Sequence, residues 1–324
     1  MSNLIGIDIG GTKCAVILGE YTEKEGISII DKISFLTEVQ KGAQYVLDKI
    51  NVSIEGILQE NGKKPDDIYS IGISSGGPLD SGKGIILSPP NLVGWDNICI
   101  VELLEKEFGI RTRLQNDANA CALAEWRFGA AKGCRNVIFL TFGTGMGAGL
   151  TLDGRLYSGT NDMAGEVGHI RLENIGPVGY GKAGSFEGFC SGGGVAQLAR
   201  TMVLEKLQAG EKVSFCAGID QLGEITAKVV EDATEAGDEL AREIYRICGC
   251  YLGRGLSILL DVLNPEIIVI GSIFARSKDL MYDAAMEVVR KEALNYSRNA
   301  CRIVPAGLGE RIGDYAALAV AACD

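Results

Sequence analysis

The sequence predicts an α/β protein made of two related lobes. Strand-like apolar runs alternate with segments of helical spacing along most of its 324 residues, which is the pattern of an α/β architecture. A glycine-rich turn follows an apolar run twice, at Asp8–Lys13 and at Thr141–Gly149, and each turn leads into another apolar run. The length suffices for two domains. We therefore expect two lobes, each a mixed sheet flanked by helices, with a small-molecule cleft between them.

The elements of the first half follow from local patterns. Strands are expected on either side of the first turn, at Leu4–Ile7 and Cys14–Leu18, and later at Tyr69–Ser74 and Thr112–Gln115. Apolar residues at helical spacing predict helices at Thr37–Glu60, Glu102–Phe108 and Asp117–Phe128. Asn116 or Asp117 is the expected cap of the last of these helices.

The second half repeats this plan. A hairpin is expected at Val137–Leu152 and a buried strand at Glu266–Ile270, which opens into Gly271-Ser272. The expected helices are Val195–Leu207, Leu222–Ala236, Asp238–Leu263, Asp279–Leu294 and Tyr315–Ala322. We expect a small lobe of residues 1–116 with about 303–324, and a larger lobe of residues 117–302.

Composition narrows the function classes. The formal net charge of −11 and a pI of about 4.8, with scattered Lys and Arg, argue against a nucleic-acid partner. No apolar run is long enough to cross a bilayer, and the N-terminus lacks the basic region of a signal peptide, so we expect a cytoplasmic protein with no membrane partner. Of the ten Cys, only Cys248 and Cys250 form a close pair, and buried thiols are the favoured interpretation.

Both glycine-rich turns suit a phosphate group, because glycine lets backbone N–H groups approach an anion and Thr and Lys add donors and charge. The first turn is not a P-loop, and an ordinary hairpin turn is the alternative interpretation. In the second, Gly143–Ala148 formally matches the dinucleotide fingerprint, but a strand follows where that fingerprint requires a helix. This context disfavours an NAD-dependent oxidoreductase and leaves a phosphate-binding hairpin.

Three further segments carry polar groups with two interpretations each. Asn116-Asp117 is either a simple helix cap or the position of a general base. His169, the one His of the chain, follows Glu166 by three residues in a glycine-rich loop, and is either a packed structural residue or a site residue. Glu187 lies in a Gly/Ser-rich stretch and is either a site carboxylate or a solvated one.

Taken together and in order, these motifs resemble the ROK family of sugar kinases, within the actin/hexokinase-like ATPases of ribonuclease H-like fold. The resemblance covers essentially the whole chain and implies Asp117 as the base that takes the proton of a sugar hydroxyl. It implies sugar contacts by Asn91, Asn116, Glu166, His169 and Glu187. It implies that ATP phosphates or Mg²⁺ meet Asp8, Gly10, Gly11, Thr12, Lys13, Thr144 and Gly145, with Asp8 holding Mg²⁺ through water and Gly271 approaching the adenosine.

The chain departs from the family pattern at its zinc site. Many members carry three Cys after the His, but Val178, Tyr180 and Ser185 stand in that register here. Since thiolates supply most of the affinity of such a site, we expect no zinc. We expect packing, with Tyr180, to fix this loop instead. Ser272 stands where the adenosine motif usually has Gly.

The resemblance implies an ATP-dependent hexose kinase acting on O6, with glucose as the default substrate. N-acetylmannosamine, N-acetylglucosamine, fructose, allose and β-glucosides are the alternatives. A homodimer is implied by analogy alone. The rival interpretation is a non-catalytic sugar-binding regulator or scaffold. Because the chain starts directly at the first phosphate strand, we expect no preceding helix-turn-helix domain of the kind that the family's repressors carry.

Overall fold

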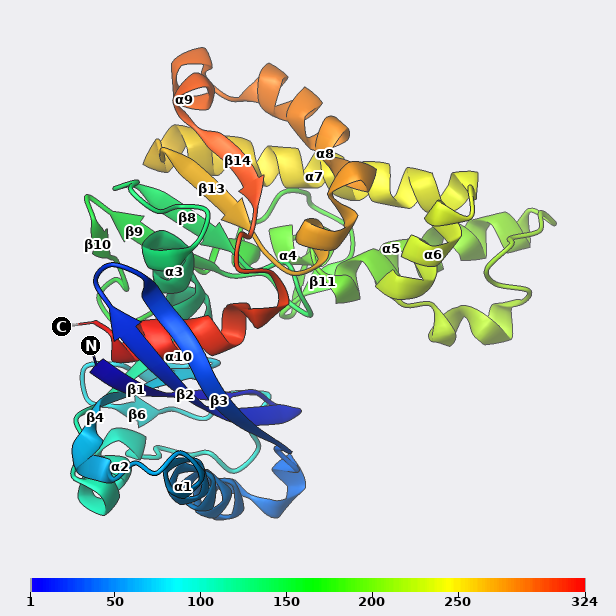
Figure 1. Cartoon of the computed structure of the whole chain (residues 1–324). Helices are drawn as coiled ribbons and strands as arrows, with labels where there is room; N and C mark the ends of the chain where they lie inside the picture. Colours follow the sequence, from blue (N-terminus) through cyan, green and yellow to red (C-terminus); the bar gives the residue numbers. More distant parts are fainter. Residues whose placement is uncertain (1, 324) are drawn as a thin grey trace. The chain divides into compact units, whose positions relative to one another are not determined.

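The computed structural model describes residues 2–323 and has an α/β architecture (Figure 1). The chain divides into two compact units. Unit 1 comprises Met1–Arg135, Gly149–Ala164 and Gly307–Asp324, and unit 2 comprises Asn136–Ala148 and Gly165–Ala306. Within residues 2–323, no helix has both the length and the apolar character that crossing a bilayer requires.

The strands form two five-stranded sheets. The first has the order β3-β2-β1-β4-β7, from Gly26–Leu36, Lys13–Thr22, Ser2–Ile9, Ile68–Ser75 and Thr112–Asn116. The second has the order β10-β9-β8-β13-β14, from Arg155–Leu156, Ala148–Leu152, Val137–Leu140, Ile267–Ile270 and Arg302–Pro305. Both sheets combine parallel and antiparallel pairs. In the first sheet, β1 pairs antiparallel with β2 and parallel with β4. In the second sheet, β13 is parallel to β8 and β14, while β9 and β10 are antiparallel to each other. The two mixed sheets with flanking helices confirm the predicted fold class.

Short two-stranded pieces accompany them at Leu79–Asp80 with Ile85–Ile86 (β5, β6) and at Val178–Gly179 with Lys182–Ala183 (β11, β12).

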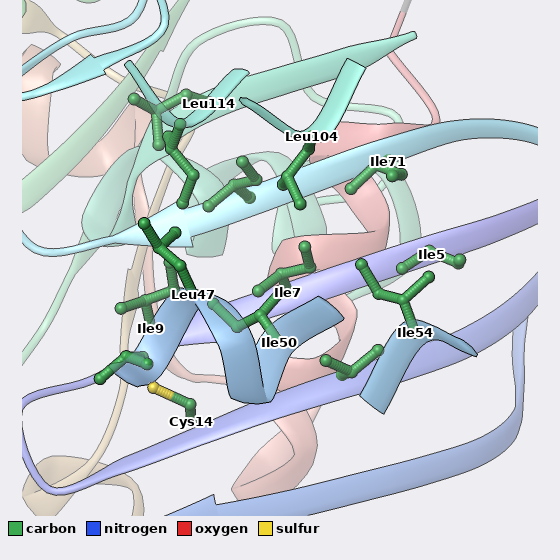
Figure 2. Close-up of a cluster of buried hydrophobic side chains, with 14 of the residues drawn as sticks. Ile5, Ile7, Ile9, Cys14, Leu47, Ile50, Ile54, Ile71, Leu104 and Leu114 are labelled. Atoms are coloured by element: carbon green, nitrogen blue, oxygen red, sulfur yellow. The ribbon is translucent and has the colours of Figure 1, made fainter. Parts of the chain in front are cut away.

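Alternation along β1 builds the core of unit 1. Ile5, Ile7 and Ile9 point to one face of the sheet, because successive strand residues face opposite sides. There they meet two helices, α1 (Ala43–Glu60) and α2 (Ile100–Phe108). Figure 2 shows this cluster, which also includes Cys14, Leu47, Ile50, Ile54, Ile71, Leu104 and Leu114. Each buried Leu or Ile side chain stabilises the fold by about 1.5–3 kcal/mol.

The other face of the first sheet is covered by α10 (Ile312–Ala321), the last helix of the chain. Glycines on the strands permit its close approach. A Cβ built on Gly72 would lie 2.2 Å from the backbone N of Ala321, and one on Gly6 would lie 3.0 Å from the Cβ of Ala317. The small Ala side chains of α10 thus pack closely against strand positions that carry glycine. Helix α3 (Asp117–Phe128) packs on α10 in the same unit through small residues such as Ala120 and Ala316.

Unit 2 is mainly helical around its strands. Its helices are α4 (Phe186–Phe189), α5 (Gly192–Gln208), α6 (Ala227–Glu235), α7 (Glu239–Leu263), α8 (Ile273–Glu292) and α9 (Asn295–Ala300). Helices α7 and α8 lie side by side (Figure 1), because Gly249 and Gly253 of α7 sit directly against the backbone of α8. Asp238 caps α7 by accepting the amide of Ala241.

Several boundaries differ from those predicted. Helix α1 begins at Ala43 rather than Thr37, because Thr37 is hydrogen-bonded to the first glycine turn and a short 3-10 helix, Val39–Lys41, follows it. The segment predicted as one helix at Leu222–Ala236 is a 3-10 helix, Ile219–Glu224, and then α6, whose cap is Thr226. Helix α8 begins at Ile273 rather than Asp279, since it continues through a kink at Ser277.

Candidate functional site

The first glycine turn joins β1 to β2 and is tied down from one side. The amide of Gly10 donates to the carbonyl of Lys13 at 3.1 Å, and the Thr37 hydroxyl donates to the carbonyl of Gly10 at 2.6 Å. Within residues 2–323 the amides of the next two residues, Gly11 and Thr12, donate to no protein acceptor. Adjacent unpaired amides in an exposed glycine turn are what an anion requires.

The turn lies against Asn91, one of the predicted sugar-contact residues of unit 1. A Cβ on Gly11 would be 2.7 Å from the carbonyl oxygen of Asn91, so the turn touches the segment that carries Asn91. Gly76 and Gly77, which follow β4, complete the arrangement. A Cβ on Gly76 would lie 3.3 Å from Nδ2 of Asn91, and one on Gly77 would lie 3.3 Å from Nδ2 of Asn116. The structure therefore gathers the turn, Asn91 and Asn116 around Gly76-Gly77.

Asp117 is the first residue of α3, where β7 ends. The Asn116 side chain accepts the amide of Ala118 at 3.0 Å, which confirms the predicted cap, and Asp117 Oδ1 accepts the same amide at 2.7 Å. Asp117 keeps solvent access, yet the surrounding protein removes enough water to raise the pKa of its carboxyl, against the opposing hydrogen bonds of backbone amides. A carboxylate with a raised pKa at an accessible strand end suits proton transfer.

Asp8, at the end of β1, faces other acids. Burial, and then the charges of Asp117 and Asp314, raise the pKa of Asp8 to about 6, although Lys32 and Lys13 oppose the shift. Its carboxylate also rests on the first turn of α10, since a Cβ on Gly313 would lie 2.9 Å from Asp8 Oδ2. A cation placed here would relieve the repulsion among the carboxylates.

Asp314 is a residue of this region that the sequence reasoning missed. It lies in α10, is buried, and forms an ion pair with Lys32 of β3. A signal was available, because Asp314 is an acidic residue within an otherwise Ala-rich apolar helix.

The second glycine turn follows β8 and is closed by its own residues. The amide of Thr141 donates to the carbonyl of Gly147 at 3.0 Å, and the amide of Gly147 donates to the Thr141 hydroxyl at 2.8 Å. Gly143 accepts the amide of Gly192 at 2.8 Å. In the part of the chain that the structure describes, the amides of Thr144 and Gly145 donate to no protein acceptor. These are the two residues predicted to contact phosphate.

The segment Gly165–His169 lies directly against this turn in unit 2. A Cβ on Gly165 would be 2.0 Å from the carbonyl oxygen of Ala148, and one on Gly168 would be 2.1 Å from that of Met146. Gly165 also has a φ of 92°, which disfavours any other residue. The side chains of Glu166 and His169, which directly follow these two glycines, are exposed. The glycines therefore fix the backbone at positions where both polar side chains reach solvent.

Glu187 approaches the same turn from α4. Its Oε2 accepts the amide of Met146 at 2.9 Å. A Cβ on Gly145 would lie only 2.8 Å from that oxygen. Glu187 is thus not the fully solvated loop carboxylate of the alternative interpretation. Unit 2 brings Thr144, Gly145, Glu166, His169 and Glu187 to one region.

Gly271 and Ser272 follow β13 beside the second turn. The amide of Gly271 donates to the carbonyl of Leu140 at 2.9 Å, and a Cβ on Gly271 would be 3.0 Å from the ring of Phe139. Ser272 has φ 54° and ψ −119°, a conformation that strains a residue with a side chain. A Cβ on Gly143 would lie 3.5 Å from the Ser272 hydroxyl, so this strained residue faces the second turn.

The loop from Ile170 to Glu187 is held by polar side chains. Gln197 of α5 accepts the amide of Val178 at 3.0 Å and donates to its carbonyl at 2.9 Å. Lys182 donates to the carbonyl of His169 at 2.7 Å, and Arg254 of α7 pairs with Glu173. The prediction that Tyr180 anchors the loop by packing is wrong. Tyr180 is 75% exposed, and its ring meets only the edge of the His169 ring at 6.4 Å.

Metal-ligand chemistry in this region is limited. Among residues 2–323, no group of three or more His, Cys, Asp or Glu side chains has the arrangement of a metal site. Any Mg²⁺ at Asp8 would therefore take its remaining ligands from water and substrate oxygens, as this ion commonly does.

A family model described as the ROK family matches residues 4–322. The curated glucokinase of Halalkalibacterium halodurans is 32% identical over 279 residues, which are 86% of this chain and 82% of that protein. The xylose repressor of Caldicellulosiruptor bescii is 26% identical over 90% of this chain and 71% of its own length.

A solved structure extends the likeness to three dimensions. The glucokinase of Streptomyces griseus, described as a ROK family protein in complex with glucose and AMPPNP, superposes with a TM-score of 0.77 at 28% identity. The match covers 99% of each chain.

Proposed function

This chain belongs to the ROK family, and we propose that it is an ATP-dependent sugar kinase that transfers the γ-phosphoryl group to a hexose hydroxyl, with O6 of glucose as the default acceptor. The observation that carries the proposal is the pair of adjacent unpaired amides in each glycine turn, Gly11-Thr12 and Thr144-Gly145. A protein that only senses sugar does not need two such phosphate cradles. The complex of the Streptomyces griseus glucokinase with glucose and AMPPNP supports the same pair of ligands.

In unit 1, the proposal gives the acid–base chemistry to Asp117. Its carboxylate would accept the proton of the attacking sugar hydroxyl, while Asn91 and Asn116 orient that sugar. Gly10, Gly11, Thr12 and Lys13 would bind phosphate oxygens. Mg²⁺ fits beside Asp8, because a hard cation prefers carboxylate oxygen and would offset the acidic neighbours. When bound, that ion supplies neutralisation of phosphate charge.

In unit 2, Thr144 and Gly145 would donate their amides to phosphate oxygens, and Gly271 would allow the adenosine to approach. Glu166, His169 and Glu187 would hydrogen-bond sugar hydroxyls, since carboxylates and an imidazole match the donors and acceptors of a pyranose. Phosphoryl transfer asks mainly for positioning and charge stabilisation, and these groups supply both.

The test is a panel of sugars incubated with the protein, ATP and Mg²⁺, with ADP release measured by a coupled assay. The panel includes glucose, fructose, allose, N-acetylglucosamine, N-acetylmannosamine and a β-glucoside. We expect sugar-dependent ADP release with at least one of them, and phosphate at O6 of the product. No release above the sugar-free background would contradict the proposal.

The alternative is a non-catalytic sugar-binding regulator of the same fold. The similarity to xylose repressors favours it. The same panel separates the two functions, because a regulator would bind a sugar in calorimetry and release no ADP.

A further inference from the structure

One carboxylate in unit 2 contacts the backbone of the second glycine turn, and it belongs to a residue assigned to sugar. We propose that Glu187 couples sugar binding to nucleotide binding, with Oε2 holding the turn that carries the phosphate-binding amides and Oε1 receiving a sugar hydroxyl. This inference rests on the proposed function and assigns Glu187 a positioning role in addition to its role as a sugar ligand.

The contact falls at a sensitive point of the turn. Met146, whose amide donates to Glu187 Oε2 at 2.9 Å, directly follows Gly145. The bonds that close the turn from within join Thr141 to Gly147 and run from the amide of Gly143 to the carbonyl of Gly145 at 3.1 Å. Within residues 2–323, Glu187 is the one residue from outside the turn whose side chain accepts a backbone amide of residues 141–147. The peptide that joins Gly145 to Met146 is thus held at its carbonyl by the Gly143 amide and at its N–H by Glu187, so the backbone next to the Gly145 amide depends in part on where Glu187 lies.

Glycines from three segments leave room for this contact. A Cβ on Gly145 would be 2.8 Å from Glu187 Oε2, one on Gly179 would be 2.8 Å from Glu187 Cβ, and one on Gly168 would be 3.2 Å from that Cβ. All three distances are shorter than ordinary van der Waals contact. The side chain is consequently confined on three sides, and its carboxylate has little freedom to leave Met146.

The second carboxylate oxygen is available. Across residues 2–323, Oε1 of Glu187 accepts no hydrogen bond from the protein. An ionised carboxylate has about four acceptor sites, so a sugar hydroxyl at Oε1 leaves the bond at Oε2 intact. A bound sugar would restrict the carboxylate, and the restricted carboxylate would hold the turn in the form that binds phosphate. By linkage, nucleotide must tighten sugar binding by the same factor.

The experiment measures the dissociation constant of AMPPNP with Mg²⁺ by calorimetry, with and without saturating glucose or, if glucose is inactive in the panel, the sugar of lowest KM. For the wild-type chain we expect sugar to tighten AMPPNP binding at least about fivefold. In Glu187→Ala the factor should fall below about twofold, and sugar-free AMPPNP binding should weaken about threefold to tenfold, because the turn loses its anchor.

Two control variants test whether any loss of coupling comes from the Glu187 contact rather than from misfolding or weaker sugar binding. Glu187→Gln keeps the shape and a neutral acceptor, so it should fold as the wild type does and show an intermediate factor. His169→Gln removes another proposed sugar ligand of the same unit whose side chain is not bonded to the turn. It should weaken sugar binding but keep the fivefold factor at saturating sugar.

The outcomes separate this inference from the proposed function. A folded Glu187→Ala variant with the wild-type coupling factor would overturn the inference and leave the kinase proposal standing. A wild-type chain that shows Glu187-dependent coupling without phosphoryl transfer would support the inference and overturn the kinase proposal. No AMPPNP binding to the wild type would overturn both.

Discussion

Around the first glycine turn the neighbouring groups are charged, whereas around the second they are mostly glycines. Asp8 lies near Asp117, Asp314, Lys32 and Lys13, and its pKa responds to all four. The second turn is packed against Gly165 and Gly168 and receives a single carboxylate, that of Glu187. Both turns nevertheless leave two adjacent amides unpaired.

One backbone motif is thus held in place by two different physical means. In unit 1 the turn is one part of an electrostatic cluster, which suits metal binding and proton transfer. In unit 2 the turn is held by close backbone packing, which suits precise placement of amides. Changes of charge should therefore act mainly through the first turn, and changes of volume mainly through the second.

Removal of the proposed base should have the largest effect. Asp117→Asn keeps the size of the side chain and the cap of α3 but accepts no proton at neutral pH. We expect kcat to fall at least about a hundredfold, with a smaller change in the KM for sugar. Asp66→Asn, which changes an exposed carboxylate of the same unit, should keep wild-type turnover. Steady-state kinetics would remove Asp117 from this role if the variant retained normal kcat.

Gly168→Ala adds a methyl group beside the second turn, and we expect it to lower the free energy of unfolding by about 3 kcal/mol. Its Cβ would lie 2.1 Å from the backbone oxygen of Met146, which cannot move without deforming the turn. Gly193→Ala is the matched control in the same unit, because its Cβ would find no atom nearer than 3.9 Å. Urea unfolding of both variants tests the packing argument, and equal stability of the two would refute it.

Neutralising the first cluster should stabilise the protein in a pH-dependent way. The pKa of Asp8 in the folded protein, about 6, lies above the 3.8 of an ordinary aspartate carboxyl. The folded state therefore binds the proton more tightly, and stability from this group falls as pH rises from about 4 to 6. Without ligands, Asp8→Asn should gain about 2 kcal/mol at pH 7.5 and little at pH 4, while losing activity.

Thermal unfolding of wild type and Asp8→Asn at several pH values measures this effect. A gain that is the same at pH 4 and pH 7.5 would show that repulsion at Asp8 is not its source.

The polar attachment of the loop at 170–187 should contribute about 1 kcal/mol through Gln197. Gln197→Ala removes both hydrogen bonds to Val178, so we expect a lower Tm and a higher KM for sugar with kcat little changed. Gln208→Ala, at an exposed position of the same helix, is the control. Gln197→Glu should recover part of the loss, since it keeps the acceptor for the Val178 amide. An unchanged KM in Gln197→Ala would show that the loop does not need this attachment.

The smallest effect is expected at Ser272. Glycine relieves the strain of a φ of 54°, so Ser272→Gly should raise the unfolding free energy by about 0.5–1 kcal/mol. Ser272→Ala keeps the Cβ and should show no gain. Parallel thermal melts decide the matter, and a gain of the same size in both variants would assign it to the hydroxyl rather than to strain.

The sequence predicted most of what depends on local pattern. The two turns, the cap at Asn116 and the long helix α7 all follow from composition within a few residues. It missed contacts that join distant parts of the chain. Asp314 meets Lys32 across 282 positions, and Gln197 reaches Val178 from another element. The packing predicted for Tyr180 was wrong for the same reason, since the residues next to it in sequence do not show whether a distant segment will cover its ring.

Helix α10 has a consequence for how the protein is made. It covers one face of a sheet whose central strand, β1, begins at Ser2. The packing of this early strand is therefore completed only by a helix that is synthesised about 300 residues later. During synthesis, Leu4, Ala15 and Ile17 stay uncovered until residues 312–321 have left the ribosome. Such sequence-distant closure slows folding and leaves apolar surface exposed meanwhile. A growing chain stalled shortly before α10 would therefore expose the uncovered apolar face of this sheet, which is the kind of surface that chaperones bind.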